Sequence, residues 1–547
     1  MRERTVVEIR RRGKLITGEP VFTPGVPIVI DRKGVGDVDG GDLAVVRLGR
    51  GRARVDRVLG RGDAIENVLE GLLVEEGLRE GFEPHTPPAP DLDGRVDLRD
   101  LVTFTVDPET AKDFDDALSF RAEDGGVRAW VHIADVAHFV PAGSPLDRGA
   151  AGRSFSTYVP GLVAPMLPHE LADDLCSLRP HVERLTVTVE FPPDGEPTFY
   201  RSVIRSDARL TYPQAHARDA EPALVEALEL GWPYAERLRR ARFERGALQI
   251  ETGEIAFEFD GRGGVARAWR ESEPEAHALV EELMIAANEA VARLLASRSR
   301  SALYRVHERP DPQAISLLIA KLAELEVPTP PEPETLSPAG AAALAGAVSQ
   351  RVRDYIARAS RGREAFPALI LRSLKQARYD PRNFGHSGLA SLAYCHFTSP
   401  IRRYPDLVCH RALLAELGSG ETAPDDLEEL AEHTSVRERE AAQVEYRADE
   451  ICLAWLLGDE LFELGWEHAF DGEIIGVIPS GVFVRFGEVF EGYVPARRLH
   501  GDYFELNPLA TALVGRRGGG RFRLGDGIRV RVEKIDRYEG KVELAPA

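Results

Sequence analysis

The sequence predicts an α+β multidomain fold, in which a central mixed α/β domain lies between two small all-β barrels of the OB type. The length of 547 residues exceeds one ordinary hydrophobic core. Short β-rich segments punctuated by Gly, Pro and Asp occupy both ends of the chain, and long helical patterns occupy the middle. We therefore expect four segments: an N-terminal barrel over 1–62, a helix and proline-rich linker over 63–100, a catalytic domain over 101–464, and a C-terminal barrel over 466–547.

The N-terminal segment consists of short apolar runs separated by turn residues, which is typical of a small barrel. The expected strands are Thr5–Ile9, Lys14–Val21, Ile28–Ile30, Asp42–Leu48 and Arg52–Leu59. Apolar residues at helical spacing over 65–73 predict a helix after them. The proline-rich stretch 82–94 then reads as a connector.

The central segment changes character along its length. Strand patterns dominate from Leu101 to about Pro213, and helical patterns dominate from Pro222 onward. The expected helices are 222–246, 275–297, 311–325, 337–360, 366–378, 404–417 and 424–464.

The last segment returns to short strands with glycine turns, which suits an OB barrel. The expected strands are Trp466–Gly476, Gly481–Phe486, Glu491–Pro495, Arg521–Leu524, Ile528–Asp536 and Lys541–Leu544.

The composition bears on the cellular compartment of the protein. No apolar run reaches the roughly 18–20 residues that cross a bilayer, and the N-terminus has no signal-peptide segment. The four cysteines form no Cys-x-x-Cys pair, as expected of reduced thiols, so we expect a cytoplasmic protein. The net charge of −20 disfavours non-specific surface binding to nucleic acid. It is compatible with a strand threaded through an internal channel that is locally positive.

The most informative motif is a cluster of four aspartates within ten residues: Asp107, Asp113, Asp115 and Asp116. Carboxylates this close repel one another, and a hard cation such as Mg²⁺ offsets that repulsion. Carboxylate-held Mg²⁺ commonly serves phosphodiester hydrolysis. The alternative is an acidic surface loop. Apolar, β-rich runs on both sides favour the metal site, because they place the acids at a strand end and its turn.

From these residues onward the chain resembles the ribonuclease II/ribonuclease R family, whose catalytic core is called the RNB domain. Eight motifs match in order. They are Asp107-Pro-Glu-Thr-Ala-Lys-Asp-Phe-Asp-Asp116, Val131-His-Ile-Ala-Asp-Val136, Arg153-Ser-Phe-Ser-Thr-Tyr158, Pro165-Met-Leu-Pro168, Leu175-Cys-Ser-Leu178, Val280-Glu-Glu-Leu-Met-Ile-Ala-Ala-Asn288, Tyr304-Arg-Val-His-Glu308 and Tyr394-Cys-His-Phe-Thr-Ser-Pro-Ile-Arg-Arg-Tyr-Pro-Asp406.

The flanking barrels carry weaker resemblances. The C-terminal barrel resembles an S1 RNA-binding domain, through Gly472-Glu-Ile-Ile-Gly476, Gly481-Val-Phe-Val484 and Glu491-Gly-Tyr-Val494. The N-terminal barrel resembles one cold-shock-type OB domain, through Gly41-Asp-Leu-Ala-Val-Val46. Family members often carry two such domains ahead of the core, and this chain has room for one.

The resemblance implies processive 3′-to-5′ hydrolysis of single-stranded RNA to nucleoside 5′-monophosphates with Mg²⁺. By position in the motif, Asp107 and Asp116 would be the principal ligands of one metal. Asp113 and Asp115 would help to hold a second metal or the attacking water, and two metals would clamp the attacking and leaving oxygens. Arg402 matches the catalytic arginine, which can bridge phosphate oxygens and stabilise the transition state.

Further matches concern contacts with RNA. Tyr158 matches an aromatic that stacks on a base near the scissile end, and Tyr212 matches a tyrosine at the 3′-terminal nucleotide. Ile250 stands where the family usually has Phe, so the clamp around the base is expected to be looser. Glu281 matches a glutamate that touches RNA. Glu445 matches one that favours ribose, by accepting from a 2′-hydroxyl.

In the C-terminal barrel, Phe483, Phe486 and Tyr493 alternate with Val on strands, as stacking aromatics do in OB folds. Each is a candidate for RNA binding, although some of them must fill the barrel. We expect single-stranded RNA as the partner, no membrane association, no small-molecule cofactor beyond the metal, and a monomer.

Two other functions remain open from the sequence. A non-catalytic RNA-binding protein on the same scaffold would need broken carboxylates, yet all four aspartates and Arg402 are present. A DNA exonuclease or phosphodiesterase would share the metal chemistry but choose deoxyribose. Digestion of RNA and DNA of one sequence separates these functions.

Overall fold

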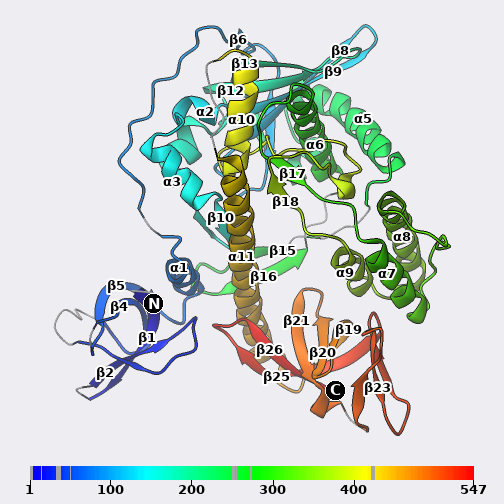
Figure 1. The fold of residues 1–547 in the computed structure, drawn as a ribbon. Helices are drawn as coiled ribbons and strands as arrows, with labels where there is room; N and C mark the ends of the chain where they lie inside the picture. Colours follow the sequence, from blue (N-terminus) through cyan, green and yellow to red (C-terminus); the bar gives the residue numbers. More distant parts are fainter. Residues whose placement is uncertain are drawn as a thin grey trace.

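The computed structural model describes residues 4–13, 15–31, 38–49, 51–79, 81–248, 253, 255–270, 274–419, 426–499 and 501–547. The two terminal β-domains lie side by side at one end of the molecule, and the central domain lies at the other (Figure 1). The long helix α11 (Leu427–Leu464) connects the two ends. At 1.5 Å per residue its 38 residues extend over about 57 Å.

The N-terminal domain is a five-stranded sheet in the order β3-β2-β1-β4-β5. Its two edges meet through a parallel bridge between Ile30 and Ala53, so the sheet curls around an apolar interior, as expected of an OB-type domain. The strands are β1 (Arg4–Arg12), β2 (Leu15–Pro20), β3 (Ile28–Val29), β4 (Asp42–Arg47) and β5 (Arg54–Arg61). Helix α1 (Ile65–Glu75) packs against this sheet and against α11.

The central domain contains a seven-stranded sheet in the order β14-β7-β8-β9-β12-β13-β6. Its pairs are antiparallel except for the two outer pairs, β14–β7 and β13–β6. The strands are β6 (Val96–Asp97), β7 (Phe104–Asp107), β8 (Asp116–Glu123), β9 (Gly126–Ala134), β12 (Glu183–Phe191), β13 (Thr198–Arg205) and β14 (Ala208–Thr211).

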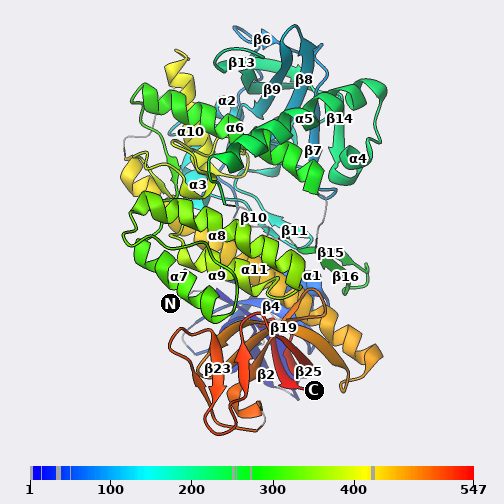
Figure 2. The same cartoon turned by 90° about the vertical axis from the view of Figure 1, so that its right-hand side faces the viewer.

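Helices α5 (Pro222–Glu244) and α6 (Pro274–Ser297) lie across this sheet (Figure 2). Gly231 permits the close approach of α5, since a Cβ there would lie 2.8 Å from the Phe120 ring and 3.1 Å from Leu279. The other helices of this region are α2 (Val136–Phe139), α3 (Pro145–Arg153), α4 (Tyr212–Ala217) and α10 (Tyr404–Glu416). The strand pairs outside the sheet are β10 (Thr157–Val159) with β11 (Leu162–Ala164), β15 (Ile255–Phe259) with β16 (Val265–Arg270), and β17 (Tyr304–Val306) with β18 (Arg378–Asp380).

Three further helices form a separate apolar cluster below the sheet: α7 (Pro312–Glu324), α8 (Pro338–Ala359) and α9 (Ala365–Ser373). Phe366 of α9 is fully buried. Leu524 of the C-terminal domain belongs to the same cluster, so these helices fix that domain to the central one.

The C-terminal domain is a closed five-stranded barrel in the order β19-β20-β21-β26-β25, which confirms the expected OB-type architecture. A small three-stranded sheet is inserted after β21. The barrel strands are β19 (Ala469–Ile478), β20 (Gly481–Phe486), β21 (Phe490–Pro495), β25 (Gly527–Asp536) and β26 (Lys541–Pro546). The inserted strands are β22 (Phe504–Leu506), β23 (Ala512–Gly515) and β24 (Arg521–Arg523).

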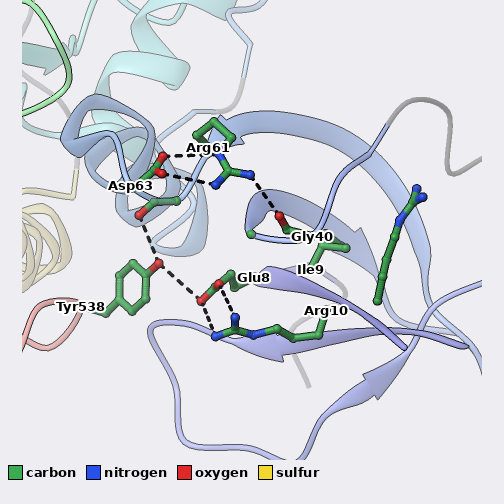
Figure 3. Close-up of a pocket in the computed structure, with 10 residues that line it drawn as sticks. Glu8, Ile9, Arg10, Gly40, Arg61, Asp63 and Tyr538 are labelled. Carbon is green, nitrogen blue, oxygen red and sulfur yellow. Dashed lines mark hydrogen bonds and ion pairs between the residues drawn. The ribbon is translucent and has the colours of Figure 1, made fainter. Parts of the chain in front are cut away.

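The turn between β25 and β26 joins the two terminal domains. Arg537 lies over the Trp455 ring of α11, 5.2 Å from its centroid. The Tyr538 hydroxyl donates to the carbonyl of Gly62 at 3.2 Å, beside a polar pocket of about 490 Å³ (Figure 3). One turn of the last barrel therefore contacts both α11 and the N-terminal domain.

The helical regions expected from the sequence are present, with ends shifted by a few residues. The short strand pairs β15–β16 and β17–β18 were not expected within the helical half. β17 and β18 have three residues each, too few for a periodic pattern, and they pair across about 70 residues of intervening chain. None of the helices in the described ranges is long and apolar enough to cross a bilayer.

A buried ion pair holds α10 against α3. Arg411, which is 1% exposed, donates to Asp147 at 2.8 Å, and Tyr404 donates to the same oxygen at 2.9 Å. We predict that Asp147→Ala lowers the free energy of unfolding by about 3–5 kcal/mol, because it leaves the Arg411 charge buried and unpaired. Urea unfolding followed by far-ultraviolet circular dichroism measures this change.

The matched control is Asp174→Ala, which removes a carboxylate that is 54% exposed and paired with Arg179 and Arg184. Its loss is expected to cost less than about 1 kcal/mol. Equal destabilisation by the two variants would contradict the assignment of Asp147.

Candidate active site

The four aspartates lie where the central sheet opens between β7 and β8. Asp107 is the last residue of β7 and Asp116 is the first residue of β8. The turn between these strands carries Asp113 and Asp115. The expectation that the acids lie at a strand end and its turn is confirmed.

Asp115 joins this turn to a distant loop. Its side chain is 3% exposed, and Oδ1 accepts a hydrogen bond from the amide of Ile401 at 2.8 Å. Oδ2 accepts from Nε of Arg402 at 3.3 Å. Burial raises the pKa of Asp115 well above its usual value, although the Arg402 charge opposes that shift.

Asp107 and Asp116 interact electrostatically with each other. Burial raises the pKa of Asp107 to about 7, and the charge of Asp116 adds to the shift. Burial also raises the pKa of Asp116 to about 6, against the charges of Arg402 and Arg403. Oδ2 of Asp107 is buried and accepts no hydrogen bond from the described residues. The turn therefore concentrates negative charge that protein donors compensate only in part.

These properties fit a hard divalent cation, which binds carboxylate oxygens and favours their ionised form. In the described part of the chain, no three acidic, His or Cys side chains are arranged to enclose a metal ion as they stand. Two of the four aspartates are engaged by protein donors, Asp115 by Ile401 and Arg402, and Asp113 by the Tyr158 hydroxyl. The residue types and the orphaned Asp107 oxygen suit a metal, and cation binding would require side-chain adjustment.

Arg402 presents its guanidinium beside Asp115. Its side chain is 45% exposed; Nη2 donates to Ser399 Oγ at 3.2 Å, and Nη1 makes no hydrogen bond to described residues. The loop that carries it is held by the fully buried Asp406, whose Oδ1 accepts from the Ser399 amide and from Arg403, both at 2.8 Å. Asp406 has no role in the sequence-based hypothesis, although it ends the longest matching motif.

Tyr158 and Glu445 meet beside the same turn. The Tyr158 hydroxyl donates to Oδ2 of Asp113, and the Tyr158 amide donates to Oε1 of Glu445 at 2.8 Å. The sequence indicates separate contacts with RNA for these two residues. The structure brings both of them together with Asp113.

Tyr212 lies at the same edge of the sheet, because the preceding residue, Thr211, pairs with Asp107 in register. One face of its ring stacks on His277, with the centroids 3.8 Å apart. Arg209 of the same strand donates to the carbonyl of Pro108 and lies 5.6 Å from the Phe114 centroid. It thus supports the aspartate turn, a role that the sequence did not indicate.

The remaining candidates are more scattered. Glu281 lies on α6 with its side chain 56% exposed, 3.4 Å from Arg242. Ile250 lies outside the described residues.

In the C-terminal barrel, Phe483 and Tyr493 are half-buried cross-strand neighbours with ring centroids 5.1 Å apart. Phe486 is 1% exposed and packs in the barrel core, so its proposal as an RNA-binding residue was wrong. The alternation of strand faces places Phe483 outward and Phe486 inward.

The raised pKa values of Asp107 and Asp116 predict a pH-dependent stability. Between about pH 4 and pH 7 these two carboxyl groups bind more protons in the folded protein than in the unfolded chain, so the stability that they contribute to metal-free protein falls as pH rises through this range. Added Mg²⁺ should reduce the loss, since a bound cation favours the ionised carboxylates. Thermal unfolding at about pH 5 and about pH 8, in EDTA and in Mg²⁺, measures both effects.

The control is the double variant Asp107→Asn, Asp116→Asn, in which neither side chain titrates. It should lack the fall in stability that these two carboxyl groups contribute between about pH 5 and about pH 8, and its response to Mg²⁺ should be weaker. Identical pH profiles for this variant and the parent chain would refute the assignment.

Comparison with known proteins finds two matching domain families in this chain. Residues 95–419 match the RNB domain, and residues 467–545 match the S1 RNA binding domain. Ribonuclease R of Escherichia coli (strain K12) is 38% identical over 483 residues, which cover 83% of this chain and 57% of that protein. Ribonuclease R of Thermotoga maritima is 35% identical over 538 residues, which cover 90% of this chain and 72% of that protein.

The fold matches a solved structure, the apo form of Mycoplasma genitalium RNase R. The TM-score is 0.88 at 24% identity, and the match covers 100% of this chain and 90% of that chain. This match shows a shared fold. The chain spans a little over half the length of its Escherichia coli relative. With the RNB match covering more than half of its residues, and with relatives above 30% identity, the chain belongs to the RNB-domain ribonuclease family.

Proposed function

We propose that this protein is a 3′-to-5′ exoribonuclease that hydrolyses single-stranded RNA processively to nucleoside 5′-monophosphates with Mg²⁺. The observation that carries the proposal is the contact of Arg402 with the turn that carries the aspartates, made through the buried Asp115. The names of the relatives, Ribonuclease R, support the same activity.

The aspartates would hold the metal in this proposal. Asp107 and Asp116 would be its principal ligands, and Asp113 and Asp115 would bind a second ion or orient the attacking water. When bound, Mg²⁺ supplies charge neutralisation and lowers the pKa of coordinated water. The partly exposed Arg402 guanidinium would bind the scissile phosphate and stabilise the negative charge that develops on it.

The RNA terminus would lie along the side chains beside this cluster. Tyr158 and Tyr212 would stack on bases, and Glu445, which accepts from the Tyr158 amide, would contact the ribose of the terminal nucleotides. Glu281 on α6 would contact the strand from the exposed side. Half-buried Phe483 and Tyr493 would bind the incoming strand on the outer face of the barrel.

We further propose the domain limits 1–62, 63–100, 101–464 and 466–547 given above, and a monomer acting in the cytoplasm. The monomer is supported because one chain supplies both the aspartates and Arg402. Its four cysteines are buried and free, which suits a reducing compartment.

The alternatives have less support. A non-catalytic RNA-binding protein would not require a buried Asp115 that forms an ion pair with a partly exposed arginine. A DNA exonuclease or phosphodiesterase would choose deoxyribose and would degrade a DNA oligomer at least as fast as an RNA oligomer of the same sequence. We expect RNA to be degraded and DNA to persist, and equal degradation would favour this alternative.

We predict that Asp115→Asn reduces hydrolysis on the order of 10⁴-fold while single-stranded RNA still binds, since it removes one member of a group that acts together. Product release from a labelled RNA and filter binding measure the two effects. Asp124→Asn, the same change in the exposed β8–β9 turn, is the control and should leave both unchanged. Undiminished turnover in Asp115→Asn would refute the role of Asp115.

The outward-facing Phe483 and the inward-facing Phe486 of the barrel give a paired prediction. Phe483→Ala should weaken RNA binding by about 1–3 kcal/mol, because it removes one stacking surface, without loss of stability. Phe486→Ala should instead destabilise the barrel by about 3–5 kcal/mol, because Phe486 packs between Phe470 and Phe490. RNA titration and thermal unfolding of both variants measure the contrast. A stability loss confined to Phe483→Ala would reverse the assignment.

A further inference from the structure

We propose that Tyr158 is a positioning residue for Asp113. In this proposal the Tyr158 hydroxyl fixes the orientation of the Asp113 carboxylate, in addition to the stacking of the Tyr158 ring on a base. The inference rests on the proposed function. It gives the Tyr158 side chain two roles: its ring stacks on a base near the 3′ end of the RNA, and its hydroxyl orients a metal-binding carboxylate.

The backbone around Tyr158 is held by two neighbouring elements, the arginine loop and helix α11. Two residues before it, the Ser156 amide donates to the carbonyl of Arg402 at 2.9 Å, and Phe155 bridges to Arg403. The Tyr158 amide itself donates to Glu445 of α11 at 2.8 Å. The strand that carries Tyr158 is thus tied both to the arginine loop and to the long helix.

The side chain completes the connection. The Tyr158 hydroxyl reaches Oδ2 of Asp113 in the β7–β8 turn. An ionised carboxylate only accepts hydrogen bonds, so the phenol is the donor. The contact engages one oxygen of Asp113 and thereby selects one orientation of the carboxyl group.

Such a contact has a known physical consequence. Donors that hydrogen-bond a metal-ligating carboxylate fix its orientation, and their removal typically costs about 10–100-fold in metal affinity or activity. The Tyr158 backbone is fixed by Glu445 and by the arginine loop, so the hydroxyl occupies a defined position. A residue that served only to stack would need no hydroxyl, and Phe would replace Tyr158 without loss.

Three variants separate these roles in the full chain. Tyr158→Phe keeps the ring and removes the hydroxyl, and Tyr158→Leu removes both. Tyr200→Phe is the control, because it deletes a phenol–carboxylate hydrogen bond of 2.6 Å to Glu190, between strands of the central sheet. Circular dichroism verifies the folding of each variant.

The measurements are kcat and KM for RNA, RNA affinity in EDTA, and Mn²⁺ affinity of the RNA-free protein by electron paramagnetic resonance. We expect Tyr158→Phe to weaken Mn²⁺ binding and kcat by about 10–100-fold, with unchanged RNA affinity in EDTA. Tyr158→Leu should add a loss of RNA affinity, and Tyr200→Phe should change nothing. In an Asp113→Asn background, Tyr158→Phe should cause no further loss of Mn²⁺ affinity, because the two residues act through one contact.

The outcomes are distinguishable. Wild-type Mn²⁺ affinity in Tyr158→Phe, or an equal loss in both backgrounds, overturns the positioning role. If the parent chain degrades no RNA, the proposed function fails, and the Mn²⁺ measurements still decide whether Tyr158 acts on Asp113. A loss of RNA affinity in Tyr158→Phe as large as in Tyr158→Leu would assign the hydroxyl to RNA binding instead.

Discussion

The site depends on one buried carboxylate. Asp115 accepts from the Ile401 amide and from the Arg402 guanidinium, and it thereby joins a sheet turn to a loop 286 residues later in the sequence. Burial makes this contact strong and also costly, because a buried carboxylate without donors would be unstable when ionised. The two segments therefore stabilise each other, and neither would keep its geometry alone.

Other contacts transmit this constraint outward. Asp406 at the start of α10 fixes the arginine loop through Ser399 and Arg403. The loop in turn fixes the strand of Tyr158 through the main-chain hydrogen bond that the Ser156 amide donates to the carbonyl of Arg402. The aspartate turn and the arginine loop belong to one continuous apolar core in the central domain. Val159, next to Tyr158, packs instead in the cluster that includes α11, so the site rests on two apolar clusters.

The charge distribution follows the same organisation. The chain carries a net charge of −20, and part of that excess lies at the buried Asp115 and the partly buried Asp107 and Asp116, whose pKa values are raised because water is excluded from them. Arg209, Arg402 and Arg403 lie around the turn but do not neutralise it completely, since no described residue donates to Oδ2 of Asp107. A divalent cation would supply the missing charge without adding protein bulk.

The sequence by itself determined the local features. The helical regions, the barrel strands and the position of Asp107 and Asp116 at strand ends follow from apolar periodicity and turn residues, which are local properties. Phe483 and Phe486 lie three positions apart and therefore face opposite sides of their strand, but only the packing of the barrel decided which of them lies inside. Only the tertiary structure decided that Tyr158 meets Asp113, that Glu445 holds Tyr158, and that Asp406 and Arg209 support the two loops. These contacts join residues from 3 to 287 positions apart and depend on how several elements pack at once, which no local pattern encodes.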